Sequence, residues 1–132
     1  MKTVLFGLGD IGQHHNIGLR KSVLFELAAV CDINPSAASR AVFSDIPFYS
    51  NEGQMLEEIK PDLAVLATPP LTHASLARLC AARGVFALVE KPLASNEEEA
   101  ASLIDHIRQG KLNMIYHWMF SQEILWFLEI NR

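Results

Sequence analysis

Gly7-Leu8-Gly9-Asp10-Ile11-Gly12 directly follows the apolar run Lys2–Phe6 and opens a helix-like stretch that extends to Lys21. Its glycines have the G-x-G-x-x-G spacing, which gains meaning where a strand passes into a helix, as it does here. The first glycine permits a tight turn, the second leaves room for a pyrophosphate, and the third lets the helix pack against the strand. The N–H groups that open the helix then face the phosphates. The sequence therefore predicts a dinucleotide-binding turn formed by Gly7, Gly9, Asp10, Ile11 and Gly12.

An acidic residue, Asp32, ends the second apolar run, Leu24–Cys31, and stands 20 residues after Gly12. A carboxylate at this place accepts hydrogen bonds from both ribose hydroxyls and repels a 2′-phosphate. No arginine adjoins it, since Arg40 lies eight residues further on. We therefore expect NAD, with NADP the less favoured cofactor. In the alternative interpretation the glycines make only a tight turn and Asp32 caps the next helix, which leaves the joint pattern unexplained.

Short apolar runs alternate with helix-like stretches along the chain. This order predicts a doubly wound α/β fold of the Rossmann type, with about six parallel strands and helices on both faces. The runs Leu63–Ala67 and Val85–Val89 are apolar without alternation, as expected for strands buried on both sides. Ser95 and Glu98 have the spacing of a capping box. The expected strands are 2–6, 24–31, 46–49, 63–67, 85–89 and 112–116, and the expected helices are 11–21, 35–42, 51–59, 71–83 and 95–109.

The composition is that of an ordinary globular domain. Of the 132 residues, 50% are hydrophobic and 20% are charged, and the formal net charge is −4 without a cluster of Lys and Arg, which argues against nucleic acid as a partner. No apolar run approaches the roughly 20 residues that cross a bilayer. Cys31 and Cys80 lack metal-ligand spacing and are expected to be buried reduced thiols, as in a cytoplasmic protein. We therefore expect no metal site, no membrane contact and a cytoplasmic location.

Two further stretches fall at the carboxyl edge of the predicted sheet. Ala67-Thr68-Pro69-Pro70-Leu71-Thr72-His73 follows the fourth run, and Glu90-Lys91-Pro92-Leu93-Ala94 follows the fifth. Together with the glycine turn and Cys31-Asp32-Ile33-Asn34-Pro35, they resemble the glucose–fructose oxidoreductase/inositol dehydrogenase family (Gfo/Idh/MocA). The resemblance covers nearly the whole chain in the right order, and the Glu-Lys-Pro step is its most specific part.

The resemblance implies roles for residues beyond the glycine turn and the acidic residue. Thr68 and Pro69 would line the cofactor beside its nicotinamide half, and Glu90 would face the nicotinamide ribose. Lys91 would reach both cofactor and substrate and stabilise the reacting oxygen, which makes it the catalytic candidate. Pro92 would follow a cis peptide bond beside the cofactor. In the plainer alternative, Lys91 is a solvated surface residue and Glu90 merely pairs with it.

The histidines are harder to interpret from the sequence. His73 matches the family's histidine after the proline step and is counted among the cofactor-binding candidates. In the plainer interpretation, His73 is a polar residue at a helix N-terminus with no role in binding or catalysis. His15 stands where the family often has a histidine in its first helix. We expect His14, His15 and His106 to be surface or packing groups. His117 ends the sixth run and is a candidate for approaching the nicotinamide or a substrate.

The family resemblance implies an NAD(P)-dependent dehydrogenase that transfers a hydride between the nicotinamide cofactor and a sugar, polyol or related hydroxyl compound. Members of the family have a second, α+β domain, which we expect this chain to lack, so that the chain alone lacks full activity. Residues 1–118 are then the dinucleotide-binding domain. The apolar segment 119–132 is expected to be a helix that leads toward a second domain or packs on a partner chain, as in a homo-oligomer. A non-catalytic NAD-binding sensor or regulatory module is the alternative function.

Overall fold

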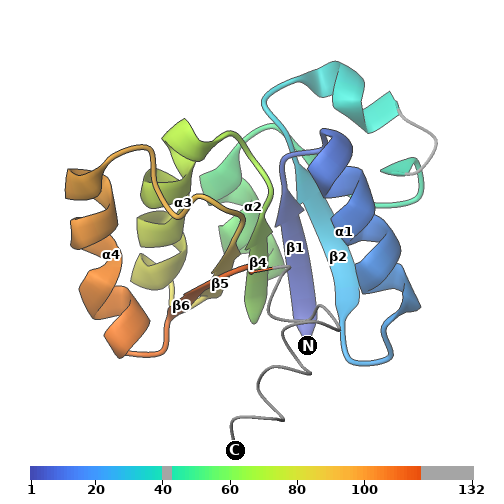
Figure 1. Cartoon of the computed structure of the whole chain (residues 1–132). Helices are drawn as coiled ribbons and strands as arrows, with labels where there is room; N and C mark the ends of the chain where they lie inside the picture. Colours follow the sequence, from blue (N-terminus) through green and yellow to red (C-terminus); the bar gives the residue numbers. More distant parts are fainter. Residues whose placement is uncertain (40–42, 117–132) are drawn as a thin grey trace, which may run out of the picture.

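The computed structural model describes residues 1–39 and 43–116, which build one six-stranded parallel sheet with the strand order β3-β2-β1-β4-β5-β6 (Figure 1). The strands are β1 (Lys2–Phe6), β2 (Glu26–Cys31), β3 (Phe48–Tyr49), β4 (Leu63–Leu66), β5 (Phe86–Val89) and β6 (Leu112–Met114). The helices are α1 (Asp10–Lys21), η1 (Pro35–Ser39, a 3-10 helix), α2 (Glu52–Ile59), α3 (Pro70–Ala82) and α4 (Glu97–Arg108). The strand order reverses between β1 and β4, so this is the predicted doubly wound α/β fold.

The observed elements are shorter than several of the predicted runs. The second strand begins at Glu26 rather than at residue 24, and the sixth ends at Met114, since pairing with the neighbouring strand covers only these residues. The predicted helix 35–42 is the 3-10 helix Pro35–Ser39, with residues 40–42 outside the described part of the chain. The predicted segment 119–132 and His117 lie outside the described residues as well.

The predicted Ser95–Glu98 capping box is wrong by one residue. Asn96 caps α4, because its side-chain oxygen accepts a hydrogen bond of 2.9 Å from the Glu99 N–H. The Glu99 carboxylate in turn accepts hydrogen bonds from the Ser95 backbone N–H, at 3.1 Å, and from the Ser95 hydroxyl. Ser95–Glu98 and Asn96–Glu99 both have the three-residue spacing of a capping box. In the structure Asn96 accepts the Glu99 N–H, and the Glu99 carboxylate reaches back to the Ser95 N–H.

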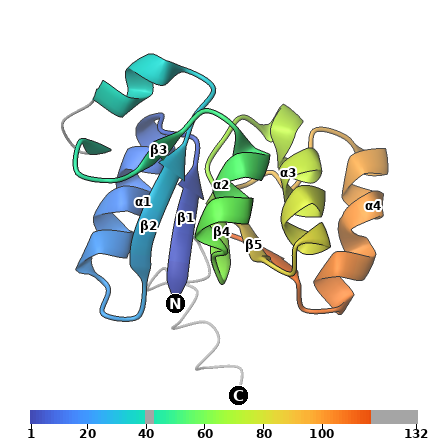
Figure 2. The same ribbon diagram turned by 180° about the vertical axis from the view of Figure 1, so that it is seen from behind.

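Helices cover the two faces of the sheet unequally. On one face, α1 packs over β1 and β2, and on the other α2, α3 and α4 lie side by side (Figures 1 and 2). Side chains alternate along each strand, so Val4 and Phe6 belong to the core under α2–α4, whereas Leu5 belongs to the core under α1. This arrangement leaves the carboxyl edge of the sheet, where loops follow the strands, free for a site.

The α1 face of β4, β5 and β6 carries no helix among the described residues. A groove lies there between α1 and the sheet, and the residues that line it include Leu63, Val65, Leu88, Met114 and Tyr116. Leu88 is therefore only half-buried, and the prediction that the fifth strand is buried on both sides is wrong for this face. The neighbouring β4 is buried along its whole length, as predicted.

The two cysteines are free and buried, as the sequence predicts. Burial raises the pKa of the Cys80 thiol to about 12. The pKa of Cys31 is also raised to about 12, mainly by burial and further by the nearby carboxylates of Glu52 and Asp32. Both thiols are therefore protonated at neutral pH and are core groups rather than nucleophiles. No helix in the described part of the chain is long and apolar enough to cross a membrane.

Candidate functional site

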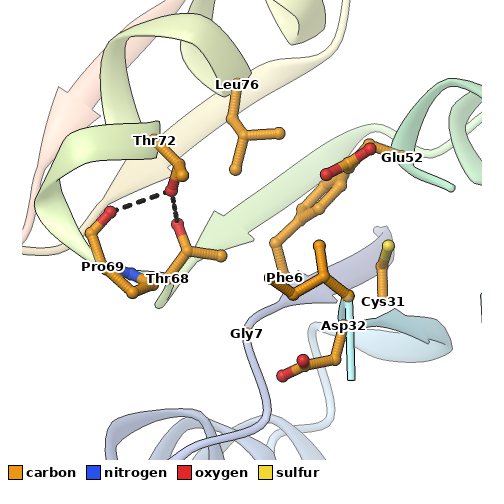
Figure 3. Close-up of a pocket in the computed structure, with 10 residues that line it drawn as sticks. Phe6, Gly7, Cys31, Asp32, Glu52, Thr68, Pro69, Thr72 and Leu76 are labelled. Atoms are coloured by element: carbon orange, nitrogen blue, oxygen red, sulfur yellow. Dashed lines mark hydrogen bonds between the residues drawn. The ribbon is translucent and has the colours of Figure 1, made fainter. Parts of the chain in front are cut away.

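Loops that follow β1, β2, β4 and β5 come together at the carboxyl edge of the sheet, because these four strands are neighbours. This edge, beside the reversal of strand order, is where doubly wound sheets bind ligands. A cleft opens there. Its lining residues are Phe6, Gly7, Cys31, Asp32, Ile33, Glu52, Thr68, Pro69, Thr72 and Leu76 (Figure 3). The structure thus brings four of the predicted site residues, Gly7, Asp32, Thr68 and Pro69, into one cleft.

The three glycines of the turn have different surroundings. Gly7 has a φ of +84°, and a Cβ built on it would lie 2.6 Å from the Ala67 carbonyl oxygen. A Cβ on Gly12 would lie only 2.0 Å from the Gly7 carbonyl oxygen. By contrast, a Cβ on Gly9 would meet no atom within 4 Å. Gly7 and Gly12 are therefore required by the fold, whereas nothing within the fold requires a glycine at position 9.

The N-terminus of α1 is open to a ligand. Gly9 is its N-cap residue, and no side chain caps it. The helical hydrogen bonds begin with the Gln13 N–H, which donates to the Gly9 carbonyl at 3.0 Å, so the N–H groups of Asp10, Ile11 and Gly12 have no acceptor within the helix. Asp10 and Ile11 are exposed. Backbone N–H groups in this arrangement, at the positive end of a helix, bind anionic groups such as phosphates.

Asp32 ties the glycine turn to the end of β2. Its Oδ2 accepts a hydrogen bond of 2.8 Å from the Leu8 N–H, and its Oδ1 accepts one of 2.8 Å from the Asn34 N–H. The alternative interpretation, in which Asp32 caps the next helix, is wrong on this point, because the Asn34 side chain accepts the Ser36 N–H at 3.1 Å at the start of η1. Each carboxylate oxygen can accept more than one hydrogen bond, so the half-buried side chain retains capacity for ribose hydroxyls.

The opposite wall of the cleft comes from the loop after β4 and the start of α3 (Figure 3). The Thr72 hydroxyl lies 2.8 Å from the Thr68 hydroxyl and 2.8 Å from the Pro69 carbonyl oxygen. These contacts hold the loop in one shape across the cleft from Asp32. Thr72 was not singled out by the sequence, although its place one turn after Thr68 at the start of a helix would have suggested the contact.

Glu90 follows β5 and is buried, with 5% of its surface exposed. The His15 Nε2 lies 2.7 Å from its Oε1, and the Lys91 N–H donates to its Oε2 at 3.2 Å. This contact involves the Lys91 backbone, so the alternative in which the Glu90 and Lys91 side chains pair stays a prediction. The predicted contact of Glu90 with the nicotinamide ribose stays a prediction. His15 is more than the surface or packing group that we expected, because it joins α1 to the loop after β5.

His73 does not line the cleft, and its ring is completely buried. Its Nδ1 lies 2.7 Å from the Pro92 carbonyl oxygen, and its Nε2 lies 2.8 Å from the Thr68 carbonyl oxygen. Direct contact between this side chain and a cofactor does not fit such burial. Instead the ring joins the loop after β4 to the loop after β5. Carbonyl oxygens only accept, so the ring donates to both when each nitrogen carries a proton.

Lys91 is exposed at the carboxyl edge, and the peptide bond between Lys91 and Pro92 is cis, as predicted. The carboxyl-edge position leaves the ammonium group available to a ligand. Within residues 1–39 and 43–116, no group of three His, Cys, Asp or Glu side chains is placed to hold a metal ion. The described site offers backbone N–H groups, hydroxyls, carboxylates and one lysine to a ligand.

Comparison with known proteins connects this site to a family. The model of an oxidoreductase family with an NAD-binding Rossmann fold, GFO_IDH_MocA, matches residues 1–117. The chain belongs to the Gfo/Idh/MocA family. This is the family that the glycine turn and the Glu-Lys-Pro step indicated, and it is a family of NAD(P)-dependent dehydrogenases.

Among curated Gfo/Idh/MocA relatives, the chain is 38% identical over 117 residues to the rhizopine catabolism protein MocA of Rhizobium meliloti, a match that covers 86% of the chain and 36% of the relative. It is 31% identical over 113 residues to the UDP-N-acetylglucosamine 3-dehydrogenase of Acidithiobacillus ferrooxidans, covering 85% of the chain and 35% of that enzyme. The chain therefore spans about a third of the length of these relatives.

Solved structures of two dehydrogenases have the same fold as this chain. The WlbA dehydrogenase of Bordetella pertussis, in complex with NADH and UDP-GlcNAcA, is 25% identical with a TM-score of 0.86, and the match covers 99% of the chain and 42% of the enzyme. The myo-inositol dehydrogenase of Lactobacillus casei, in complex with NAD(H) and myo-inositol, gives a TM-score of 0.89 at 22% identity, over 99% of the chain and 41% of the enzyme. The second likeness shows the fold alone.

Proposed function

We propose that this domain binds NAD(H) in the cleft at the carboxyl edge and forms the cofactor-binding part of a dehydrogenase acting on a sugar, polyol or related hydroxyl compound. The observation that carries the proposal is the combination of the uncapped start of α1 with the open space at Gly9 and with Asp32 beside it. A pyrophosphate needs the first two features, and an adenosine ribose needs the third.

The residues present fit the proposed cofactor. The N–H groups of Asp10, Ile11 and Gly12 would hold the pyrophosphate, and the Asp32 carboxylate would accept from the ribose hydroxyls. Thr68 and Pro69 would form the wall toward the nicotinamide half. The cofactor itself would accept or donate the hydride. The protein has to orient the reacting groups and stabilise the charge that develops on the substrate.

Lys91 is the residue that we propose for stabilising this charge. Oxidation of a hydroxyl compound moves a hydride from carbon to the cofactor, and the hydroxyl proton must also leave. Negative charge therefore develops on the oxygen, and a lysine ammonium within hydrogen-bond reach stabilises it. Lys91 is exposed at the same edge of the sheet as the cleft. Lys91 would stabilise this charge, and a general base among further residues over the nicotinamide would take the hydroxyl proton.

The substrate class rests on the relatives. The names of family members refer to UDP-N-acetylglucosamine, D-apiose and inositol, all of which carry hydroxyl groups on neighbouring carbons. We therefore propose a small polyhydroxy compound as the partner of the site, in a protein in which this domain acts with further residues over the nicotinamide. A panel of free sugars, inositols and nucleotide sugars, assayed for NAD reduction by the natural protein that contains this domain, tests the class.

The Gly9→Ala variant should separate cofactor binding from folding. Gly9 has a φ of −69° and a ψ of −165°, which alanine adopts without strain, and the added methyl group meets no atom of the protein. It would instead occupy space at the uncapped helix start. We expect the NADH affinity to fall about 10- to 100-fold, the loss of one or two hydrogen bonds to a charged group. Isothermal titration calorimetry with NADH measures the change.

Gly18→Ala is the matched control, because Gly18 lies in the same helix and an added Cβ there also meets no atom within 4 Å. It should leave NADH affinity unchanged and raise the free energy of unfolding by about 1 kcal/mol. Equal NADH affinities of Gly9→Ala and Gly18→Ala would contradict the proposed pyrophosphate position. Absence of NADH binding by the unaltered chain at millimolar ligand would contradict the proposed function itself.

The domain should prefer NADH to NADPH by about tenfold or more. The carboxylates of Asp32 and Glu52 both line the cleft, so a 2′-phosphate would enter a region of negative charge. Replacement of Asp32 by Asn keeps one acceptor oxygen and removes one charge. It should therefore lower the ratio of NADH affinity to NADPH affinity. Calorimetry with both dinucleotides, at matched ionic strength, gives the ratio. Tighter binding of NADPH than of NADH by the unaltered chain would overturn the assignment of Asp32 to the ribose.

A further inference from the structure

We infer that His15 and His73 are positioning residues that hold the Lys91 turn, residues 90–92, from two sides. The inference rests on the proposed function, in which Lys91 acts on the substrate, and adds two residues to it. Neither ring is proposed to touch substrate or cofactor. Each acts through a hydrogen bond to this turn, and the two bonds come from different helices, α1 and α3.

On the first side, His15 acts through Glu90. Its Nε2 lies 2.7 Å from Oε1 of the buried carboxylate, and the other carboxylate oxygen accepts from the Lys91 N–H at 3.2 Å. The side chain of His15 is 20% exposed, whereas that of Glu90 is 7% exposed. The ring thus binds one oxygen of the carboxylate, and the other oxygen holds the backbone just before the Lys91 Cα.

On the second side, His73 binds the turn directly. Its Nδ1 lies 2.7 Å from the Pro92 carbonyl oxygen, and the His73 side chain itself is completely buried. Its Nε2 lies 2.8 Å from the Thr68 carbonyl oxygen, so the same ring reaches the wall of the cleft. The backbone is therefore held just after the Lys91 Cα as well.

Anchors before and after the Cα of Lys91 determine where its side chain starts. A lysine side chain on an exposed loop otherwise has large rotational freedom, which must be lost before it can act on a bound oxygen. Because an error of about 1 Å in the placement of a reacting group costs about 100-fold in rate, a fixed starting point matters for this residue.

The two histidines use different nitrogens toward the turn, and amide side chains can mimic each nitrogen separately. The asparagine amide nitrogen is as many bonds from Cβ as Nδ1 is, and the glutamine amide nitrogen is as many as Nε2 is. His15→Gln should therefore keep the bond to Glu90, and His15→Asn should lose it. The pattern is reversed at the other side, where His73→Asn should keep the bond to Pro92 and His73→Gln should lose it.

Hydrogen exchange at the Lys91 amide, followed by nuclear magnetic resonance, reports on the turn without any need for turnover. We expect exchange to speed up about tenfold in His15→Asn and His73→Gln, the effect of losing one hydrogen bond that anchors the turn. In the reciprocal variants, His15→Gln and His73→Asn, it should stay within about threefold of the unaltered chain. In the natural protein, His15→Asn and His73→Gln should lower kcat while the NADH affinity stays the same.

His73→Asn loses the contact with the Thr68 carbonyl oxygen and keeps the one with Pro92. This variant should therefore lower the NADH affinity and leave kcat unchanged. His14→Asn is the control for loss of a histidine from α1, since the His14 Nδ1 contacts the Asp10 carbonyl oxygen within the helix. Should the fully buried position 73 not tolerate an amide and the variant unfold, the partly exposed position 15 still tests the inference.

Equal exchange rates for the Asn and Gln variants of His15 would overturn the inference, because the ring would then only fill space. If the Lys91 amide of His73→Gln exchanged as slowly as that of the unaltered chain, the role of His73 in holding the turn would be overturned as well. These outcomes are separate from failure of the proposed function. A chain that shows the expected exchange pattern but does not bind NADH would keep the two anchors and lose the catalytic purpose that we assign to them.

Discussion

Gly12→Ala should destabilise the domain by about 3–5 kcal/mol of the free energy of unfolding, more than typical overpacking does. The new Cβ would lie 2.0 Å from the carbonyl oxygen of Gly7, far inside contact distance. The atom that it meets belongs to the backbone, so a side-chain rotation cannot relieve the clash. Relief requires α1 to move away from β1 or the glycine turn to open. Thermal unfolding followed by circular dichroism should show a midpoint lowered by about 10 °C or more.

Comparison with Gly18→Ala isolates the clash from the general effect of alanine in a helix. Both substitutions lie in α1, and the alanine at position 18 meets no atom within 4 Å. The two variants should therefore move the midpoint in opposite directions. A thermal midpoint for Gly12→Ala within about 2 °C of that of the unaltered chain would show that the turn can open without cost. The fold would then not require the close packing of α1 on the turn.

Lys91→Ala should lower kcat/KM for hydride transfer by about 10²–10³-fold, the effect of removing one group that stabilises developing charge on oxygen. The residue is exposed, and its removal leaves the fold and the buried Glu90 in place. NADH affinity should therefore stay within about threefold of that of the unaltered protein. Initial rates of NAD reduction, measured with the natural protein that contains this domain, give the ratio.

Lys91→Arg is a useful companion, since it keeps the charge but changes the shape of the group and the directions of its hydrogen bonds. A rate between those of Lys91→Ala and the unaltered protein is expected. Undiminished turnover in Lys91→Ala would remove Lys91 from the proposed mechanism. NADH binding without turnover of any compound in the panel would favour the alternative function, a non-catalytic NAD-binding module.

The fold could be predicted from the sequence because its signals are local. The glycine turn identifies one strand–helix junction, and apolar runs such as Leu63–Leu66 identify strands without reference to any distant residue. The burial of the fifth strand was less predictable. Whether Leu88 is covered depends on what packs over the α1 face of the sheet, and the composition of the strand does not contain that information.

The candidate site was predictable in its outline and not in its internal contacts. Asp32, Thr68 and Lys91 follow strands, and parallel strands bring such residues to one edge. The contacts of His15 and His73 depend on which loop comes to lie opposite each ring. His15 meets a residue 75 positions away, a distance over which neither periodicity nor capping patterns give any signal. The family resemblance marked both positions without indicating what either ring binds.

The double use of Asp32 has a consequence for how nucleotide preference can change in this chain. The carboxylate that we assign to the ribose also accepts the Leu8 N–H at 2.8 Å and so stabilises the glycine turn. A single substitution that admits NADPH by removing this side chain would therefore also remove a hydrogen bond worth about 1 kcal/mol from the turn. An evolutionary or engineered route to NADP use would have to supply another acceptor at the turn before, or together with, the loss of the charge.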